Sequence, residues 1–402
     1  MENAVLWIWL AEAIGQGSSL FGKCHRMGYS VNDLYQGDEA FLSSLFSRKT
    51  AAFSRLLDKS LEKAQGILEK CQSLGIRILH AASPDYPAAL WNLENPPPVL
   101  YVKGCLSPKD FGVCVGVVGT REPTDYGSQM AYTLACSLAK SGVTVISGLA
   151  LGIDTLAHAG ALAVGGKTVA VLASGVDKIT PGRHKEIGEH ILHQGAILSE
   201  YPPGTSPRSY HFPCRNRLVA ALSSVLAVLE GGVESGAMIT AKCAMALGKP
   251  IYALPGRLGE AQAQGPMHLL SLGANLILGE DTISRGLEKE ISSLEKPSPR
   301  ECMTMPEAEE YFGLLETKPQ KQTQKAETPP SPAPKKERKE VDLSFLSAAE
   351  RQLYLAIPEE GSCLPDDLLL EDLTAIQVMR YLTNLEMEGL IERHAGGRIS
   401  RT

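Results

Sequence analysis

The chain has 402 residues, 44% of them hydrophobic, and carries a formal net charge of −6 at pH 7. This length exceeds one hydrophobic core of ordinary size and predicts two or three domains. No apolar run approaches membrane-spanning length, which argues against a membrane protein. The nine cysteines include no C-x-x-C, which argues against a zinc site and favours reduced thiols in the cytoplasm.

Residues 1–80 are expected to form a small helical domain of the SAM or helix-hairpin-helix type. Helical runs with short turns fill this part, including 10–28 and 54–75. A proline-rich connection, 83–104, follows. Its last residues, VLYVKG, are rich in β-branched and aromatic side chains and predict an added strand.

Residues 81–285 are expected to form the central domain. From 111 onward, short β-branched runs alternate with helical runs. Apolar strands that alternate with helices predict an α/β fold with a Rossmann-like, doubly wound parallel sheet. Ligands of such sheets bind beyond the carboxyl ends of the strands. Glycines lie at these predicted ends, at Gly119, Gly148, Gly231, Gly232 and Gly256.

The rest of the chain predicts a linker and a third domain. Residues 286–341 combine a weakly patterned segment with a run rich in proline and lysine, whose scarce apolar residues predict a disordered tether. Residues 342–402 show three helical stretches and two short strands around a Gly-Gly turn, the pattern of a winged helix. The helix that would enter the major groove, 375–388, carries one arginine against two glutamates. We therefore favour a protein-interaction role over duplex binding for this domain.

The stretch VVGTREPTDYG follows the first predicted parallel strand and opens the next helix. Gly119 permits a tight turn with free backbone N–H groups, Thr120 offers a hydroxyl, and Arg121 offers a fork of donors that matches phosphate. A solvated arginine at an ordinary strand-to-helix turn is an equally good interpretation. The stretch is neither the G-x-G-x-x-G fingerprint nor a Walker A loop, which argues against bound NAD and against ATP hydrolysis.

A second glycine turn begins at Ser147 and Gly148, at the end of the next strand. Asp154 is expected to cap the helix that follows. His158, one turn later, is interpreted as a packing or hydrogen-bonding residue rather than a base or a metal ligand.

A third turn, in EGGVESGAMITAK, also suits an anion. Ser235, Gly236 and Thr240 lie at a predicted helix start, where backbone N–H groups attract negative charge. Lys242 adds a cation in the next turn.

The segment FPCRNR places an aromatic ring next to two cations. Phe212 can stack on a base, Arg215 and Arg217 can contact phosphates, and Asn216 can tie neighbouring loops together. This combination suits a single strand, because unpaired bases expose their faces and each stacked base contributes about 1–3 kcal/mol. The alternative is that Asn216 and Arg217 cap a helix and pair with carboxylates, for which the candidates are Glu200 and Glu230.

These motifs, taken in order, closely resemble the DNA-processing protein A (DprA/Smf) family. The resemblance is strong over residues 85–280 and looser in the flanking parts. It implies a non-catalytic protein that needs no cofactor and binds single-stranded DNA. It further implies self-association as a homodimer and help in loading RecA recombinase onto incoming DNA during natural transformation.

The resemblance also implies the site residues. Thr120 replaces the serine of the family's Gly-Ser-Arg loop and keeps the hydroxyl, whereas residues 176–187 lack the family's typical Tyr-Pro…Asn. Family self-association points to the segment 265–277, with Leu270 and Leu276 as apolar candidates. The predicted DNA-binding residues are Gly119, Thr120, Arg121, Ser147, Gly148, Phe212, Arg215, Asn216, Arg217, Ser235, Gly236, Thr240 and Lys242.

Two other classes of function stay open at this point. A similar glycine-rich fold occurs in phosphoribohydrolases of the lysine-decarboxylase-like group, which carry P-G-G-x-G-T-x-x-E with a catalytic glutamate. The comparable place here is EGGVESGAMIT, and Glu230 and Glu234 keep that enzyme class possible. The third class is a scaffold whose phosphate loops bind a regulatory nucleotide.

Overall fold

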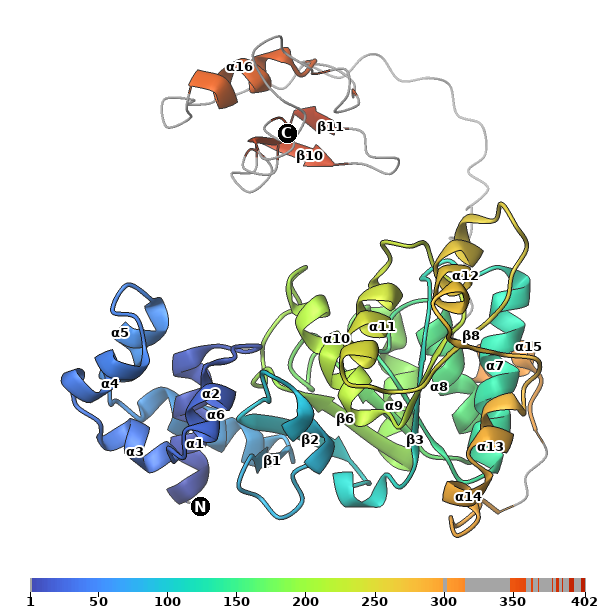
Figure 1. The fold of residues 1–402 in the computed structure, drawn as a ribbon, viewed down its shortest axis with the longest axis horizontal. Coiled ribbons are helices and arrows are strands. Elements are labelled where there is room, and N and C mark those ends of the chain that lie inside the picture. The colour runs from blue at the N-terminus through green and yellow to red at the C-terminus, as the bar shows by residue number, and fades with distance from the viewer. Residues whose placement is uncertain are drawn as a thin grey trace, which may run out of the picture. The chain divides into compact units, whose positions relative to one another are not determined.

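The chain divides into two compact units, Met1–Pro319 and Gln320–Thr402 (Figure 1). No helix within the described residues combines the length and the apolar character needed to cross a membrane. The computed structural model describes residues 2–298, 302–314, 348–358, 363, 368, 378, 381–382, 385, 390–393 and 399–401.

The first unit begins with a series of short helices. Ser30, Asp38 and Thr50 start three of them by accepting a backbone N–H of the first turn, which explains where the chain breaks into separate helices. Their bounds are α1 (Glu2–Ile14), α2 (Leu20–Arg26), α3 (Val31–Gln36), α4 (Glu39–Leu45), α5 (Ala51–Leu57) and α6 (Glu62–Ser73).

A nine-stranded sheet forms the centre of the unit, in the order β1-β2-β6-β5-β4-β3-β7-β8-β9. The seven strands from β6 to β9 in this order run parallel, whereas β2 pairs antiparallel with both β1 and β6. The strand expected in the proline-rich connection is therefore confirmed, as β2. The strands are β1 (Arg77–His80), β2 (Val99–Gly104), β3 (Cys114–Val118), β4 (Thr144–Ser147), β5 (Thr168–Val171), β6 (Gly195–Ser199), β7 (Val225–Val228), β8 (Ile251–Ala253) and β9 (Asn275–Leu276).

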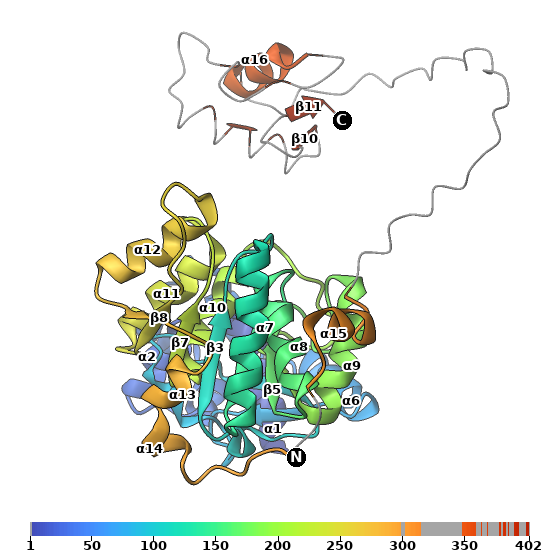
Figure 2. The ribbon, with the colours of Figure 1, turned by 90° about the vertical axis from the view of Figure 1, so that its right-hand side faces the viewer.

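Helices cover both faces of the parallel part. The chain moves outward from β3 to β6 through α7, α8 and α9, and then returns past β3 to β7 and β8 through α10 and α11. Because such crossovers are right-handed, the two directions of travel put the two groups of helices on opposite faces. Figure 2 shows α7 and α8 side by side in front of the sheet. The bounds are α7 (Asp125–Lys140), α8 (Ile153–Ala163), α9 (Lys185–Gln194), α10 (His211–Leu222) and α11 (Gly236–Ala246).

This order reverses direction at β3, which lies between β4 and β7. The connections that follow β3 and β7 run to opposite sides, so no connection covers the space between these two strands. A crevice therefore forms beyond their carboxyl ends. The α/β fold with a mostly parallel, doubly wound sheet is confirmed, and the glycine turns after β3, β4 and β7 meet at this point.

The N-terminal helices share a hydrophobic core with the sheet. One cluster of buried side chains runs from Val5 in α1 through Tyr101 in β2 to Phe312 near the end of the unit. Helices α1 and α6 contact β1, so they extend the sheet's core beyond its antiparallel edge, as Figure 1 shows in blue. The boundary expected after residue 80 stays a prediction.

The chain after β8 folds back over the sheet. Helix α12 (Gln264–Ser271) precedes the edge strand β9, and α13 (Thr282–Gly286), α14 (Glu288–Ile291) and α15 (Met305–Tyr311) follow it. Helix α13 contacts α7, and α15 contacts α8. Part of the weakly patterned segment is therefore ordered along the α7–α8 face.

The second unit has its own core. Helix α16 (Ala348–Ala356) supplies Leu353 and Tyr354, and the antiparallel pair β10 (Ile391–Arg393) and β11 (Ile399–Arg401) confirms the two short strands expected there. The predicted tether and most of the helix expected at 375–388 lie outside the described residues, so the winged helix stays a prediction.

Candidate functional site

A cavity of about 290 Å³ opens at the carboxyl ends of β3, β4 and β7. Three loops and the first turns of α10 and α11 build it, as the reversed strand order requires. Its lining residues are Val118, Gly119, Thr120, Arg121, Gly148, Ala150, Asp154, Phe212, Arg215, Asn216, Val219, Ser235, Gly236, Ala237 and Thr240. The structure thus brings most of the predicted DNA-binding residues together, and leaves Ser147, Arg217 and Lys242 outside the lining.

A cation and an aromatic ring stand together in the lining. The Arg121 side chain is exposed, and its guanidinium carbon lies 5.4 Å from the centroid of the half-buried Phe212 ring. This distance is within cation–π range, so the ring holds the guanidinium while leaving its donors available. The Thr120 Oγ1 accepts the backbone N–H of Glu122 at 3.2 Å, which shapes the turn next to Arg121.

A second guanidinium is fixed in the cavity wall. Arg215 is only 4% exposed, and its Nη1 donates to the carbonyl oxygens of Gly148, at 2.6 Å, and Val171. Its Nε donates to the Asn216 Oδ1 at 3.0 Å. Because these bonds use several of its donors, Arg215 provides positive charge and shape rather than a mobile clamp.

The glycine turn after β4 differs from the anion cradle that the sequence predicts. The Asp154 Oδ2 accepts the backbone N–H groups of Gly148 at 3.1 Å and Ala150 at 3.4 Å, and the Ser147 hydroxyl donates to Val117 at 2.6 Å. These donors are therefore used inside the protein. Asp154 closes this loop and does not cap α8, whose N-cap is Gly152. Burial raises the pKa of the Asp154 carboxyl, against the opposing effect of Arg215.

Replacing Gly148 by alanine should destabilise the protein. A Cβ at this position would meet the Arg215 guanidinium, so we expect the free energy of unfolding to fall by about 1–3 kcal/mol. Urea unfolding measures this change. Gly236→Ala is the matched control, because a Cβ there meets nothing within 4 Å. Equal stability of the two variants would contradict the packing described here.

The turn before α11 uses two backbone donors inside the protein, since the N–H of Gly231 donates to the Gln262 carbonyl oxygen at 2.6 Å and that of Ser235 to the Gly232 carbonyl oxygen at 3.0 Å. Ser235 is the N-cap residue of this helix, and its hydroxyl makes no hydrogen bond within the described part of the chain although it is buried. The Asn216 Nδ2 donates to the Gly236 carbonyl oxygen at 3.1 Å, which confirms that Asn216 ties neighbouring backbone together. Ser235 and the α11 N-terminus can therefore bind an anionic oxygen. Lys242 is exposed on α11, outside the cavity lining.

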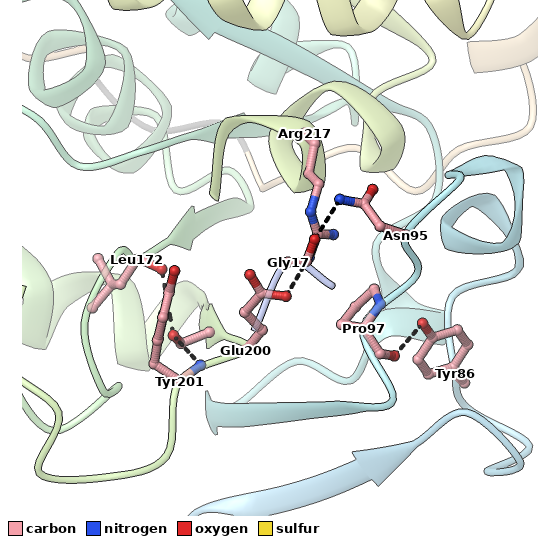
Figure 3. Close-up of polar contacts among 9 residues, drawn as sticks. Gly17, Tyr86, Asn95, Pro97, Leu172, Glu200, Tyr201 and Arg217 are labelled. Carbon is pink, nitrogen blue, oxygen red and sulfur yellow. Dashed lines mark hydrogen bonds and ion pairs between the residues drawn. The ribbon is translucent and has the colours of Figure 1, made fainter. Parts of the chain in front are cut away.

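Arg217 lies on α10 but its charge is directed away from the cavity. Its Nη2 forms an ion pair with the Glu200 Oε2, and the two side chains are only 6% and 3% exposed. Figure 3 shows this pair beside the Gly17 loop, whose carbonyl oxygen accepts the Asn95 Nδ2 at 2.9 Å. The alternative that Arg217 pairs with Glu200 is thereby confirmed. Because the pair is closed off from solvent, Arg217 fastens α10 to the end of β6.

Glu230, the other acidic candidate, has a structural contact as well. Its carboxylate is 5% exposed and accepts the Thr124 backbone N–H at 2.9 Å and the Thr124 hydroxyl at 2.6 Å, one on each oxygen. A carboxylate at this place stabilises the N-terminus of α7. Glu234 is exposed and does not line the cavity.

A second cavity of about 210 Å³ adjoins the first and shares Arg121, Gly148, Ala150 and Phe212 with it. Its other lining residues are mostly apolar. Sequence reasoning missed this cavity, although Leu149 and Leu151 inside a glycine turn were a signal, because turns are usually polar. The apolar residues that line this cavity alone are Leu149, Leu151, Leu172, Ala173, Pro181 and Pro207.

His158 has no exposed surface, and its Nδ1 lies 2.7 Å from the Thr168 Oγ1. This confirms that it is a packing and hydrogen-bonding residue. Burial, with smaller effects of His184 and Arg215, lowers its pKa to about 3. The imidazole is therefore neutral in the folded protein at neutral pH.

Acidification should lower the stability of the protein because the pKa of His158 is lowered in the folded state. The unfolded chain binds a proton at His158 near pH 6.5 and the folded chain does not, so the stabilisation present above pH 6.5 is lost as the pH falls toward 3. The expected loss is about 1.4 kcal/mol per pH unit in this window. Urea unfolding at pH 7, 6 and 5 measures the slope, and His158→Asn should reduce it. An unchanged slope in that variant would assign the loss to other groups.

The two apolar residues proposed for self-association lie near the outer edge of the sheet. Leu276, in the edge strand β9, is 41% exposed, whereas Leu270 in α12 is partly buried against the core. Leu272 and Leu278 on either side of β9 are exposed as well. An exposed apolar edge strand is a surface suited to pairing with another chain.

Comparison with known proteins places the cavity in a matched segment. The sequence model of the family described as DNA recombination-mediator protein A matches residues 77–288. The protein Smf of Synechocystis sp. is 35% identical over 337 residues, which cover 83% of this chain and 82% of that protein. The segment 77–288 contains every residue that lines either cavity.

Two solved structures are also similar. That of DNA processing protein A from Streptococcus pneumoniae is 27% identical, with a TM-score of 0.60, and the match covers 71% of this chain and 96% of that one. The other is a structure of DNA processing protein A from Helicobacter pylori, described as giving insight into its single-stranded DNA binding mode. It is 35% identical, with a TM-score of 0.49, and the match covers 54% of this chain and 96% of that one.

Proposed function

Because the chain belongs to the DNA recombination-mediator protein A family, we propose that its cavity at the β3–β7 reversal binds single-stranded DNA without catalysing a reaction on it. The observation that carries the proposal is the pairing of the exposed Arg121 guanidinium with the Phe212 ring, 5.4 Å away, in the lining of the cavity. A cation and a ring at one place suit a phosphate and an unpaired base of the same strand.

The size of the cavity favours a single strand over a duplex. A volume of about 290 Å³ suits a group of nucleotide size, whereas a duplex keeps its bases stacked and would present only its backbone to the rim. The Phe212 ring gains a stacking partner only from an unpaired base.

Some residues of the site contact DNA, and others hold the contacting residues in position. Arg121 and the Ser235 hydroxyl bind phosphate oxygens, and Phe212 stacks on a base. Arg215 and Asn216 set the shape and charge of the wall, and Arg217 holds α10 in place. Lys242, exposed on α11 about two turns after Ser235, contacts a strand that extends past the cavity.

Binding to labelled oligonucleotides tests the proposal. A single strand should bind more tightly than a duplex of equal length, and the affinity should fall with salt at a log–log slope of roughly −0.7 per phosphate neutralised. Equal affinity for both, or no dependence on salt, would count against it.

The enzyme alternative is not favoured. Both oxygens of the Glu230 carboxylate accept hydrogen bonds from Thr124, and neither Glu230 nor Glu234 lines the cavity. The carboxylate that does line it, Asp154, accepts the backbone N–H groups of Gly148 and Ala150. Incubation with nucleoside monophosphates should therefore release no free base. Release that depends on Glu230 or Glu234 would restore the alternative.

We also propose that the protein pairs with a second copy through the edge strand β9. Leu276→Lys places a charge on the exposed apolar edge, so we expect a shift from dimer to monomer in sedimentation at micromolar concentration. Leu57→Lys, at an exposed position of α5 in the N-terminal helices, is the matched control. A dimer that resists the first change would place the interface elsewhere.

The family further suggests a partner in recombination. We propose that the protein acts in the cytoplasm, protects incoming single strands during natural transformation and helps to load the cognate RecA recombinase. Capture of that recombinase by the full chain, with and without a single-stranded oligonucleotide, tests this step. Absence of capture under both conditions would remove it.

A further inference from the structure

Two cysteines that are distant in the sequence meet on the α7 face, away from the DNA cavity. The Sγ atoms of Cys136, in α7, and Cys302 lie 3.9 Å apart, although 166 residues separate them. Cys136 is buried and Cys302 is exposed. Both line a groove of about 640 Å³ whose other walls include Glu280, Asp281 and Ser284.

The backbone next to Cys302 is held against α7. The Tyr132 hydroxyl donates to the carbonyl oxygen of Met303, the residue after Cys302, at 2.7 Å. Tyr132 lies on α7, four positions before Cys136, so this bond holds the Cys302 backbone next to Cys136. Thr304 and Glu307 form a capping box that starts α15, and Phe312 is only 1% exposed. The approach of the two sulfur atoms is therefore set by ordered structure on both sides of the groove.

The two thiols differ in reactivity. The Cys136 Sγ donates to the Gly160 carbonyl oxygen at 3.2 Å, and burial, with a smaller effect of Cys302, raises its pKa to about 12. Cys302 is open to solvent, where it can reach a small disulfide. Cys302 is thus the thiol that reacts first, and Cys136 the one that resolves the mixed disulfide.

We propose that Cys136 and Cys302 are a redox-active pair that forms a reversible intramolecular disulfide by exchange with a low-molecular-weight disulfide such as oxidised glutathione. The Cys302 thiolate attacks one glutathione sulfur, and the first glutathione leaves as a thiolate. Cys136 then gives its proton to a base in the groove or in solvent and attacks the Cys302 sulfur, which releases the second glutathione. Two protein thiols are oxidised and one glutathione disulfide is reduced to two thiols.

The cross-link requires a small movement. The sulfur atoms must approach from 3.9 Å to about 2.05 Å, which rotation of the exposed Cys302 side chain can supply. The product would tie the segment before α15 covalently to α7.

Peptide mapping of the full chain tests the pair. The reduced protein is incubated with oxidised glutathione, alkylated and digested without reduction, and we expect a peptide pair joined through Cys136 and Cys302. Cys302→Ser should abolish this product. Cys105→Ser, which removes another exposed cysteine, is the matched control and should retain it.

Limited proteolysis gives a second test of the disulfide, and it requires no substitution of the buried Cys136. After nicking at Lys289 or Lys296, the two fragments should stay joined on a non-reducing gel if the protein was oxidised, and separate after reduction. Glutathione found on Cys302 without the internal link, or links to other cysteines at similar yield, would overturn the proposal. Neither outcome bears on DNA binding, since the groove and the DNA cavity share no residue.

Discussion

Alanine in place of Arg217 is expected to lower the free energy of unfolding by about 3–5 kcal/mol. Its guanidinium and the Glu200 carboxylate are paired with almost no exposed surface, so removal of the cation leaves a buried carboxylate without its counter-charge. Burial already raises the pKa of Glu200, and Arg217 is the group that opposes this effect most. Urea unfolding at neutral pH measures the loss.

A double variant separates charge from packing. Glu200→Leu together with Arg217→Met removes both charges and keeps much of the volume, so its stability should return close to that of the unchanged protein or exceed it. If the double variant is as unstable as Arg217→Ala, the loss comes from shape rather than from the unpaired charge. If Arg217→Ala itself costs nothing, the burial described for the pair is contradicted.

Loss of the Arg121 side chain is expected to have the largest effect on DNA binding. A charge-assisted hydrogen bond to phosphate is worth about 1.5–3 kcal/mol, so Arg121→Ala should weaken binding of a single-stranded oligonucleotide by roughly 10- to 150-fold. The log–log slope of affinity against salt should become shallower by roughly 0.7, because one phosphate contact is lost. Fluorescence anisotropy at several salt concentrations measures both quantities.

Matched variants identify what each group contributes. Arg121→Lys keeps the charge and should keep the salt slope, although it loses the two-pronged contact. Phe212→Ala should weaken binding by about 1–3 kcal/mol without changing the slope. Because the two side chains contact each other, the double variant should lose less than the sum of the single losses. Unchanged binding in Arg121→Ala would refute the site.

The strands and glycine turns could be predicted because their signals are local. Each short β-branched run from Cys114 to Leu276 became a strand of the sheet, since buried parallel strands need continuous apolar segments. The position of the cavity followed from the glycines after these strands, because parallel strands end at one edge. The residues of these motifs, in their order along the chain, indicated the family that the comparisons then showed.

The fate of individual polar side chains could not be predicted in the same way. Arg215 and Arg217 are two residues apart on α10, yet one lines the cavity and the other is buried against Glu200. Positions two apart on a helix face different directions. Only the packing of α10 against β3, β4, β5 and the Gly17 loop decides which direction meets a carboxylate. Gly148 and Asp154 likewise bind each other instead of a ligand.

The sequence by itself determined the order of strands and helices, the family and the edge of the sheet at which a ligand would bind, because these depend on periodicity and on glycine at strand ends. Only the tertiary structure decided which cations stay available, which donors are consumed inside the protein and which thiols meet. Those outcomes depend on distances between segments far apart in the chain, and such distances are fixed by packing rather than by local pattern.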